Sequence, residues 1–221
     1  ACDVLESAED FDLAVHDLIK EYATKHQRIV FNGNGYAPEW EKEARRRGLP
    51  VLPSMVDAIP ALTTDKAVEL FGEFGVFTKT ELESRAEIQY EIYAKAINIE
   101  AKTMVDMATK QIIPAVIKYT TVLAESINQV KAVGPIDVSV QMDLLKKASK
   151  LLKEVNSTMN KLSKLVDQIE THPEGRDRAV FCREKLVPAM EKLREPVDEL
   201  EMLVDKDMWP MPSYGDLVFE P

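Results

Sequence analysis

The side chains most able to bind metals or catalyse reactions are few and scattered in this 221-residue chain. The histidines are His16, His26 and His172, and the closest pair is ten residues apart, whereas a metalloprotease helix needs two histidines four apart. None has a glutamate three residues before it, as helical di-metal sites require. Cys2 and Cys182 have no second Cys or His at ligand spacing. We therefore predict no catalytic residue, no metal ligand and two free thiols.

One loop has residues suited to holding an anion. Asn32, Gly33, Asn34 and Gly35 follow a strand-like apolar run over 28–31, and a helix starts soon after them. Asn and Gly tolerate the positive φ angles that let successive backbone amides face one ligand. The four residues are thus candidates for an anion-binding loop, although Asn-Gly repeats are more often plain turns. Since no phosphate-loop or dinucleotide motif accompanies them, no cofactor is predicted to bind this chain.

A second group of polar residues, Asn98, Glu100 and Lys102, lies within an apolar stretch of a long predicted helix. A helix with polar residues set into its apolar stripe usually has a specific partner. That partner is either another helix of the same chain or a neighbouring subunit, and the sequence leaves both alternatives open. The three residues are interface candidates.

Charge excludes several classes of partner. The chain has 38 acidic and 28 basic side chains, a formal net charge of −10, so its surface repels phosphate backbones and anionic lipids. No apolar run reaches the roughly 18 residues needed to span a bilayer, and the first residues are acidic, unlike a signal peptide. We expect no nucleic-acid or membrane partner and a cytoplasmic location. Because the first methionine is Met55, we also expect the sequence to be a piece of a longer polypeptide.

Apolar residues recur at about 3.6-residue spacing through most of the chain, which predicts helices. Three long amphipathic helices are expected over 81–131, 140–171 and 176–205, with breaks at Gly134-Pro135 and at 172–175. Short breaks fold consecutive helices back on one another, so residues 63–207 are predicted to form an antiparallel bundle.

The two ends of the chain are predicted to differ from this bundle. Residues 1–62 are expected to be a small α/β portion with a helix over 5–26, a strand over 28–31, a helix over 39–47 and an extended proline-rich connection. Residues 208–221 are rich in proline, which predicts an extended tail. Its aromatic residues Trp209, Tyr214 and Phe219 are interface candidates, because such a tail needs a surface to dock on. The predicted fold class is mainly α.

A family resemblance begins at the segment RIVFNGNGYAPEWEKEARRRGLP, which is similar to the C-terminal region of type III glutamine synthetase, the large bacterial form of that enzyme. It continues, in the order that the family shows, through LPSMVDAIP, ELFGEFGVFTKTELESRAEI, KAINIEAKTMVDMATKQIIPA and WPMPSYGDLVF. The resemblance covers essentially the whole chain. The sequence departs from the family pattern at Ala86, where an aromatic residue is usual, and at Ser54 and Met55, where threonines are usual.

The resemblance implies a parent enzyme that joins glutamate and ammonia at the expense of ATP, with Mg²⁺ or Mn²⁺ held by carboxylates. Those sites would belong to a catalytic domain preceding Ala1, and residues 1–62 would be the tail end of that catalytic body. None of its functional residues carries over to positions in this chain. The resemblance further implies a homo-oligomer of double-hexamer rings, with this region supporting assembly and inactive alone.

The alternative is a free-standing helical scaffold or regulator that binds a partner protein. The coding sequence upstream of Ala1 distinguishes the two hypotheses, because only the first expects it to continue for several hundred codons.

Overall fold

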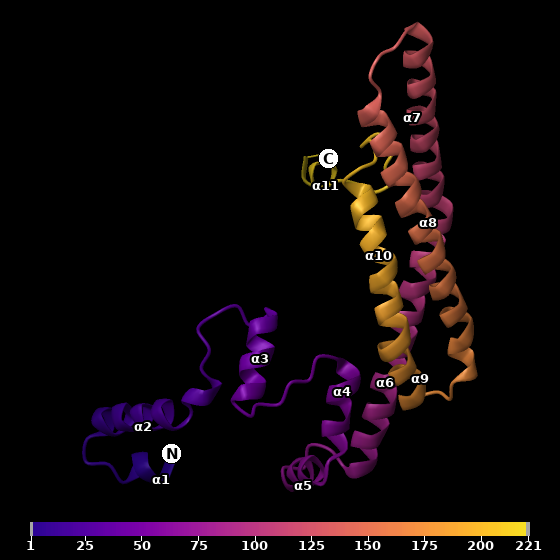
Figure 1. Ribbon diagram of the computed structural model, residues 1–221. Helices are drawn as coiled ribbons and strands as arrows, with labels where there is room; N and C mark the ends of the chain where they lie inside the picture. The colour runs from indigo at the N-terminus through magenta and orange to yellow at the C-terminus, as the bar shows by residue number, and fades with distance from the viewer. Residues whose placement is uncertain (1, 220–221) are drawn as a thin grey trace. The chain divides into compact units, whose positions relative to one another are not determined.

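The computed structural model describes residues 2–219, and its regular elements are helices, as Figure 1 shows. No β-strand occurs within this described range, so the predicted mainly α class is confirmed, while the α/β character predicted for the N-terminal portion is wrong. The chain divides into two compact units, Ala1–Pro53 and Ser54–Pro221. The division falls earlier than the boundary predicted after residue 62, because Val56 and Ile59 are buried in the core of the second unit.

The N-terminal unit consists of short helices: α1 (Cys2–Glu6), α2 (Phe11–Lys25), the 3₁₀ turn η1 (Gln27–Ile29) and α3 (Pro38–Arg46). The single helix predicted over 5–26 is therefore split. The break has a local cause, because the Asp10 side chain accepts a hydrogen bond of 3.0 Å from the Leu13 amide and so caps the start of α2.

The strand predicted over 28–31 is wrong, since its first residues form η1. A strand needs a neighbour for its backbone groups, and no other strand exists within the described residues. Instead, the guanidinium of Arg47 donates to the carbonyls of Arg28 and Val30, at 3.2 and 2.6 Å. A side chain of the following helix thus satisfies the groups that a sheet would have paired.

The second unit begins with α4 (Met55–Ala58), the 3₁₀ turn η2 (Ile59–Thr63) and α5 (Asp65–Glu73). The extended connection predicted over 49–62 is therefore wrong in its second half. Ser54 caps α4 by accepting from the Asp57 amide at 3.4 Å, and Pro60 sits in the first turn of η2, where a missing N–H costs nothing.

The predicted antiparallel bundle is confirmed. Its first arm is α6 (Lys79–Met107), the π-helical turn η3 (Ala108–Ile112) and α7 (Ile113–Val133); its second is α8 (Ser139–Gln168) with the 3₁₀ turn η4 (Ile169–Thr171); its third is α9 (Arg176–Phe181), the π-helical turn η5 (Cys182–Leu186) and α10 (Val187–Glu201). Figure 1 shows the three arms running side by side in alternating directions. The middle helix α8 packs against both α7 and α10, and α6 packs against α9.

The starts and irregularities of these helices follow from particular residues. Thr78 and Glu81 form a capping box: the Thr78 amide donates to the Glu81 carboxylate at 2.7 Å, and the Glu81 amide donates to Thr78 Oγ1 at 3.3 Å. Each π-helical turn ends two residues before a proline, Pro114 or Pro188. A proline has no amide donor and crowds the carbonyl four residues back, and the wider turn absorbs both effects without breaking the helix.

One hydrophobic cluster lines the interior of the bundle, drawn from all three arms and from α4 and η2. Its largest fully buried side chains are Val116, Val155, Leu162, Ile169, Cys182, Leu186, Leu193 and Leu200. Burial of a side chain of this kind stabilises a fold by about 1.5–3 kcal/mol. The bundle is therefore stabilised by a hydrophobic core formed by its own helices.

The C-terminal tail differs from its prediction. Residues 214–219 form a short helix, α11 (Tyr214–Phe219), so an extended conformation is wrong for them. Ser213 starts this helix, because its Oγ accepts from the Asp216 amide at 3.3 Å and its own amide donates to the Asp216 carboxylate at 2.7 Å. The last two residues of the predicted tail, 220 and 221, lie outside the described range.

Candidate functional site

The predicted anion-binding loop is a closed turn. Its side-chain acceptor, Asn34 Oδ1, receives the Tyr36 amide at 3.0 Å, and the Asn34 carbonyl receives the Ala37 amide at 3.2 Å. Neither Gly33 nor Gly35 has a positive φ, so the expected left-handed backbone is absent there. Asn32 is exposed. A turn does occur at the predicted residues, but it lacks the backbone conformation on which the anion-loop hypothesis depended.

An aromatic contact explains Gly33 better than a ligand does. The Phe31 ring folds back over this glycine, and a Cβ added there would lie 2.7 Å from the ring. The same ring packs against Trp40 with centroids 4.4 Å apart, and the Arg47 guanidinium lies 5.9 Å from the Trp40 centroid. The turn thus fastens the segment before it to α3.

The interface candidates on α6 divide by burial. Glu100 and Lys102 are exposed, whereas Asn98 is half-buried. Asn98 Oδ1 is inaccessible to solvent and accepts no hydrogen bond from any described residue. A buried acceptor without a donor is costly and rare, so Asn98 is unusual in this bundle. Ile99 beside it is 64% exposed. An interface role for the three polar residues stays a prediction.

The interface candidates of the tail split into an anchor and an exposed part. Trp209 is half-buried and packs on the hydrophobic core together with Met208. Its Nε1 is inaccessible and, within the described residues, has no acceptor. Tyr214 and Phe219 are instead 89% and 84% exposed. The tail therefore grips the bundle at Trp209 and presents its other aromatic rings outward.

A groove of about 760 Å³ lies between α10 and this tail. Its floor is mainly apolar and includes Ile112, Val197, Trp209 and Leu217. Around it, Met202, Leu217 and Val218 are exposed as well, at 88%, 66% and 67%. Sequence reasoning missed Met202 and Val218, because single apolar residues near a helix end carry no signal of exposure.

An ion pair holds the tail over the groove. Lys206 Nζ lies 2.9 Å from the Asp216 carboxylate, which also accepts from the amide and hydroxyl of Ser213 at 2.7 Å each. The bond from Lys206, and then those from Ser213, lower the pKa of Asp216 to about 2. The carboxylate is therefore charged at neutral pH, and the tail helix stays fastened to the end of α10.

Residues 2–219 were also compared with the requirements of metal sites, disulfides and membrane-spanning helices. No group of three or more His, Cys, Asp or Glu side chains in this range is placed to hold a metal ion. Both cysteines are free thiols, as predicted, with Cys2 exposed and Cys182 buried, and burial raises the pKa of the Cys182 thiol. None of the described helices has both the length and the apolar character that crossing a membrane requires.

The second unit is a helical bundle followed by a tail with exposed apolar residues. The chain belongs to the glutamine synthetase C-terminal domain family, whose model matches residues 14–131. This confirms the resemblance to the C-terminal region of type III glutamine synthetase.

Individual relatives agree with the family. The chain is 33% identical to a glutamine synthetase of Butyrivibrio fibrisolvens over 96% of its own length and 31% of that protein. It is 32% identical to the type-3 glutamine synthetase of Dictyostelium discoideum, over 93% of this chain and 29% of the relative. A glutamine synthetase of Bacteroides fragilis (strain YCH46) is 30% identical over 98% of this chain and 30% of its own length. The chain thus spans just under a third of the length of these relatives.

Proposed function

We propose that this chain is the assembly region of a glutamine synthetase, which makes glutamine from glutamate, ammonia and ATP. The observation that carries the proposal is the exposed apolar tail, Met202 with Tyr214, Leu217, Val218 and Phe219, in a chain of this family. Isolated exposed apolar residues are common, but several on one short segment mark a protein contact. The tail docks on a second subunit and helps to hold the oligomer together.

The N-terminal unit supports the same proposal. In α2, no residue is buried, and Phe11, Leu13 and Ile19 are 60%, 58% and 63% exposed. A lone amphipathic helix of this length is marginal in water and gains its stability from packing of its apolar face. We assign the catalytic body of the enzyme as the surface that covers α2.

We assign the residues that bind ATP and metal ions and carry the reaction to a part of the enzyme outside this chain. ATP and Mg²⁺ or Mn²⁺ would require clustered carboxylates, and the described residues contain no such cluster. We therefore assign no residue in the range 2–219 a role in the reaction. We also expect no nucleic-acid or membrane partner and a cytoplasmic location, in keeping with the net charge of −10.

An activity assay tests the division of labour between this region and the catalytic body. The purified 221-residue chain is incubated with glutamate, ammonia and MgATP, and glutamine is measured by chromatography. We expect none above the level without protein. ATP-dependent glutamine formation that copurifies with the chain would overturn the proposal.

The coding sequence gives a second, independent test. An open reading frame that continues upstream of Ala1 for several hundred codons, about the share missing relative to the relatives, agrees with the proposal. A start codon directly before Ala1 would instead favour a free-standing scaffold.

A further inference from the structure

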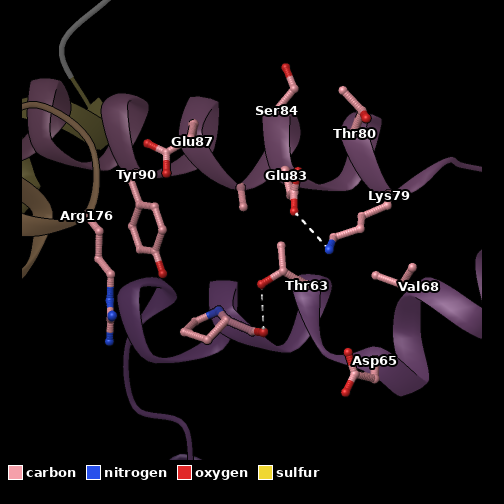
Figure 2. Close-up of a pocket in the computed structure, with 12 residues that line it drawn as sticks. Thr63, Asp65, Val68, Lys79, Thr80, Glu83, Ser84, Glu87, Tyr90 and Arg176 are labelled. Carbon is pink, nitrogen blue, oxygen red and sulfur yellow. Dashed lines mark hydrogen bonds and ion pairs between the residues drawn. The ribbon is translucent and has the colours of Figure 1, made fainter.

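A cavity of about 760 Å³ opens between η2, α5, α6 and α9, at the end of the bundle where α6 begins and away from the tail groove (Figure 1). This volume is in the range of small-molecule sites. Figure 2 shows the side chains that line it. The cavity lies wholly within the second unit, and neither the family match nor the assembly proposal gives it a role.

Tyr90 is the most deeply set polar residue of this cavity. It is 5% exposed, yet its hydroxyl makes no hydrogen bond with any described residue. In Figure 2 the hydroxyl points from α6 across the cavity toward η2. Burial raises the pKa of the phenol, so it is a neutral donor at physiological pH. A hydroxyl that faces a cavity and has no partner among the described residues can form a hydrogen bond to a ligand there.

Two charged side chains, Arg176 and Glu87, lie near Tyr90. Arg176, the first residue of α9, extends beside Tyr90 toward the same end of the cavity (Figure 2). Glu87 lies one turn before Tyr90 on α6. Both are close enough to affect the pKa of the Tyr90 hydroxyl, in opposite directions. Among residues 2–219 neither takes part in an ion pair or hydrogen bond, so both charges are available to a ligand.

A glycine leaves room for Glu87 in this position. Gly175 has φ of +79° and is buried, and a Cβ added there would collide with Glu87 Oε2. The absence of a side chain at this glycine lets the carboxylate rest against the turn that begins α9. Glu87 and Arg176 are therefore brought together by one tight turn, although 89 residues separate them in sequence.

The charges of the cavity select among ligands. Its other cation, Lys79, is paired with Glu83 at 3.8 Å, so these two cancel. The remaining charged residues of the lining are Arg176, Glu87 and Asp65, with Arg176 and Asp65 at opposite ends of the cavity (Figure 2). A phosphate with two negative charges would be repelled by both carboxylates, whereas a molecule with one carboxylate and one ammonium group meets an opposite charge at each end.

We propose that this cavity binds a small zwitterion, with its carboxylate on the Arg176 guanidinium and the Tyr90 hydroxyl and its ammonium group on Glu87. The Arg176 contact is a charge-assisted hydrogen bond, the Tyr90 contact is a neutral one, and the Glu87 contact discriminates zwitterions from simple anions. The site is independent of the assembly role of the tail.

Calorimetric titration of the 221-residue chain tests the site. The probes are glycine, β-alanine and γ-aminobutyrate, which differ in the separation of their charges, with acetate, methylammonium and inorganic phosphate for comparison. We expect at least one zwitterion to bind about tenfold more tightly than acetate, methylammonium and phosphate. Arg176→Gln should weaken that zwitterion by about tenfold or more, and Tyr90→Phe, which keeps the ring in the core, by about threefold to tenfold.

Two further variants give the matched controls. Glu87→Gln should weaken the zwitterion and leave acetate unchanged. Arg194→Gln removes an exposed arginine that lies outside this cavity and pairs with Asp198 at 3.1 Å, so binding should not change. Circular dichroism melting of each variant verifies the fold. Absence of binding by all three zwitterions below about 50 mM, tighter binding of phosphate, or equal binding by the Arg176→Gln variant would overturn the proposal.

Discussion

The two units of this chain use their apolar residues in opposite ways. Within the described residues of the N-terminal unit, Ala44 is the one buried hydrophobic residue, and α2 buries none. In the second unit, α8 alone buries Ala148, Leu151, Val155, Met159 and Leu162. Both units contain amphipathic helices, so a hydrophobic pattern by itself does not tell whether its partner belongs to the same chain. The second unit carries its own core, whereas the first presents an apolar face.

Truncation of a core side chain should give the largest effect on stability among the tests of this contrast. Leu193 is 1% exposed in the bundle, and Leu193→Ala should lower the free energy of unfolding by about 2–5 kcal/mol, because it leaves a cavity. The matched change Ile19→Ala, at a side chain 63% exposed in α2, should alter it by less than about 0.5 kcal/mol. Urea unfolding followed by circular dichroism measures both. Equal losses would show that α2 is packed as tightly as the bundle.

Two glycines sharpen the contrast within the bundle. Gly175→Ala should destabilise the chain by about 1–3 kcal/mol, because φ is +79° and the new Cβ meets the Glu87 carboxylate. Gly72, in α5, has ordinary helical geometry and open space around it, so Gly72→Ala should stabilise by about 0.4–1 kcal/mol. Thermal melting distinguishes the two signs. A neutral Gly175→Ala variant would contradict the tight turn described for the zwitterion site.

Acid should release the tail before it unfolds the bundle. Asp216 has its pKa lowered from 3.8 to about 2 by Lys206 and Ser213, so its stabilising contribution is complete above about pH 4 and is lost as the pH falls toward 2. Trp209 fluorescence reports on the tail, and far-ultraviolet circular dichroism reports on the bundle. We expect Asp216→Asn to show the acid form of the fluorescence at neutral pH. A tail signal that does not change between pH 4 and 2 would refute the role of this carboxylate.

The turn in the N-terminal unit gives the smallest effect. Gly33→Ala places a methyl group against the Phe31 ring and should loosen its contact with Trp40, while Gly35→Ala meets nothing within 4 Å. We expect a change in Trp40 fluorescence for the first variant only, with a loss of stability below about 1 kcal/mol. If inorganic phosphate protects wild type and neither variant, the anion-loop hypothesis is restored.

Local patterns were sufficient for much of this fold. The 3.6-residue period and the breaks at Gly134-Pro135 and at 172–175 predicted the bundle, because each is a property of neighbouring residues. The prediction of a strand over 28–31 was wrong, because a strand needs a second strand elsewhere in the chain to pair with. The helix at the end of the tail was missed because it starts from a side-chain contact between Ser213 and Asp216.

The sites were harder to predict than the helices. Trp209, Tyr214 and Phe219 were found as interface candidates because aromatic residues in a proline-rich tail are conspicuous. Tyr90 and Arg176 gave no signal, since they lie 86 residues apart and only the packing of α9 beside α6 brings them to one cavity. A hydroxyl that faces a cavity without a partner among the described residues is a property of the packed structure alone.

Sedimentation velocity tests the assembly role most directly. The wild-type 221-residue chain is compared with the tail variant Tyr214→Ser/Phe219→Ser and with the control Ile136→Ser/Val140→Ser, which removes exposed apolar residues before α8 and in its first turn. The account predicts that the wild type and the control self-associate at tens of micromolar and that the tail variant stays monomeric. A monomeric wild type, or association that survives loss of both tail residues, would contradict it.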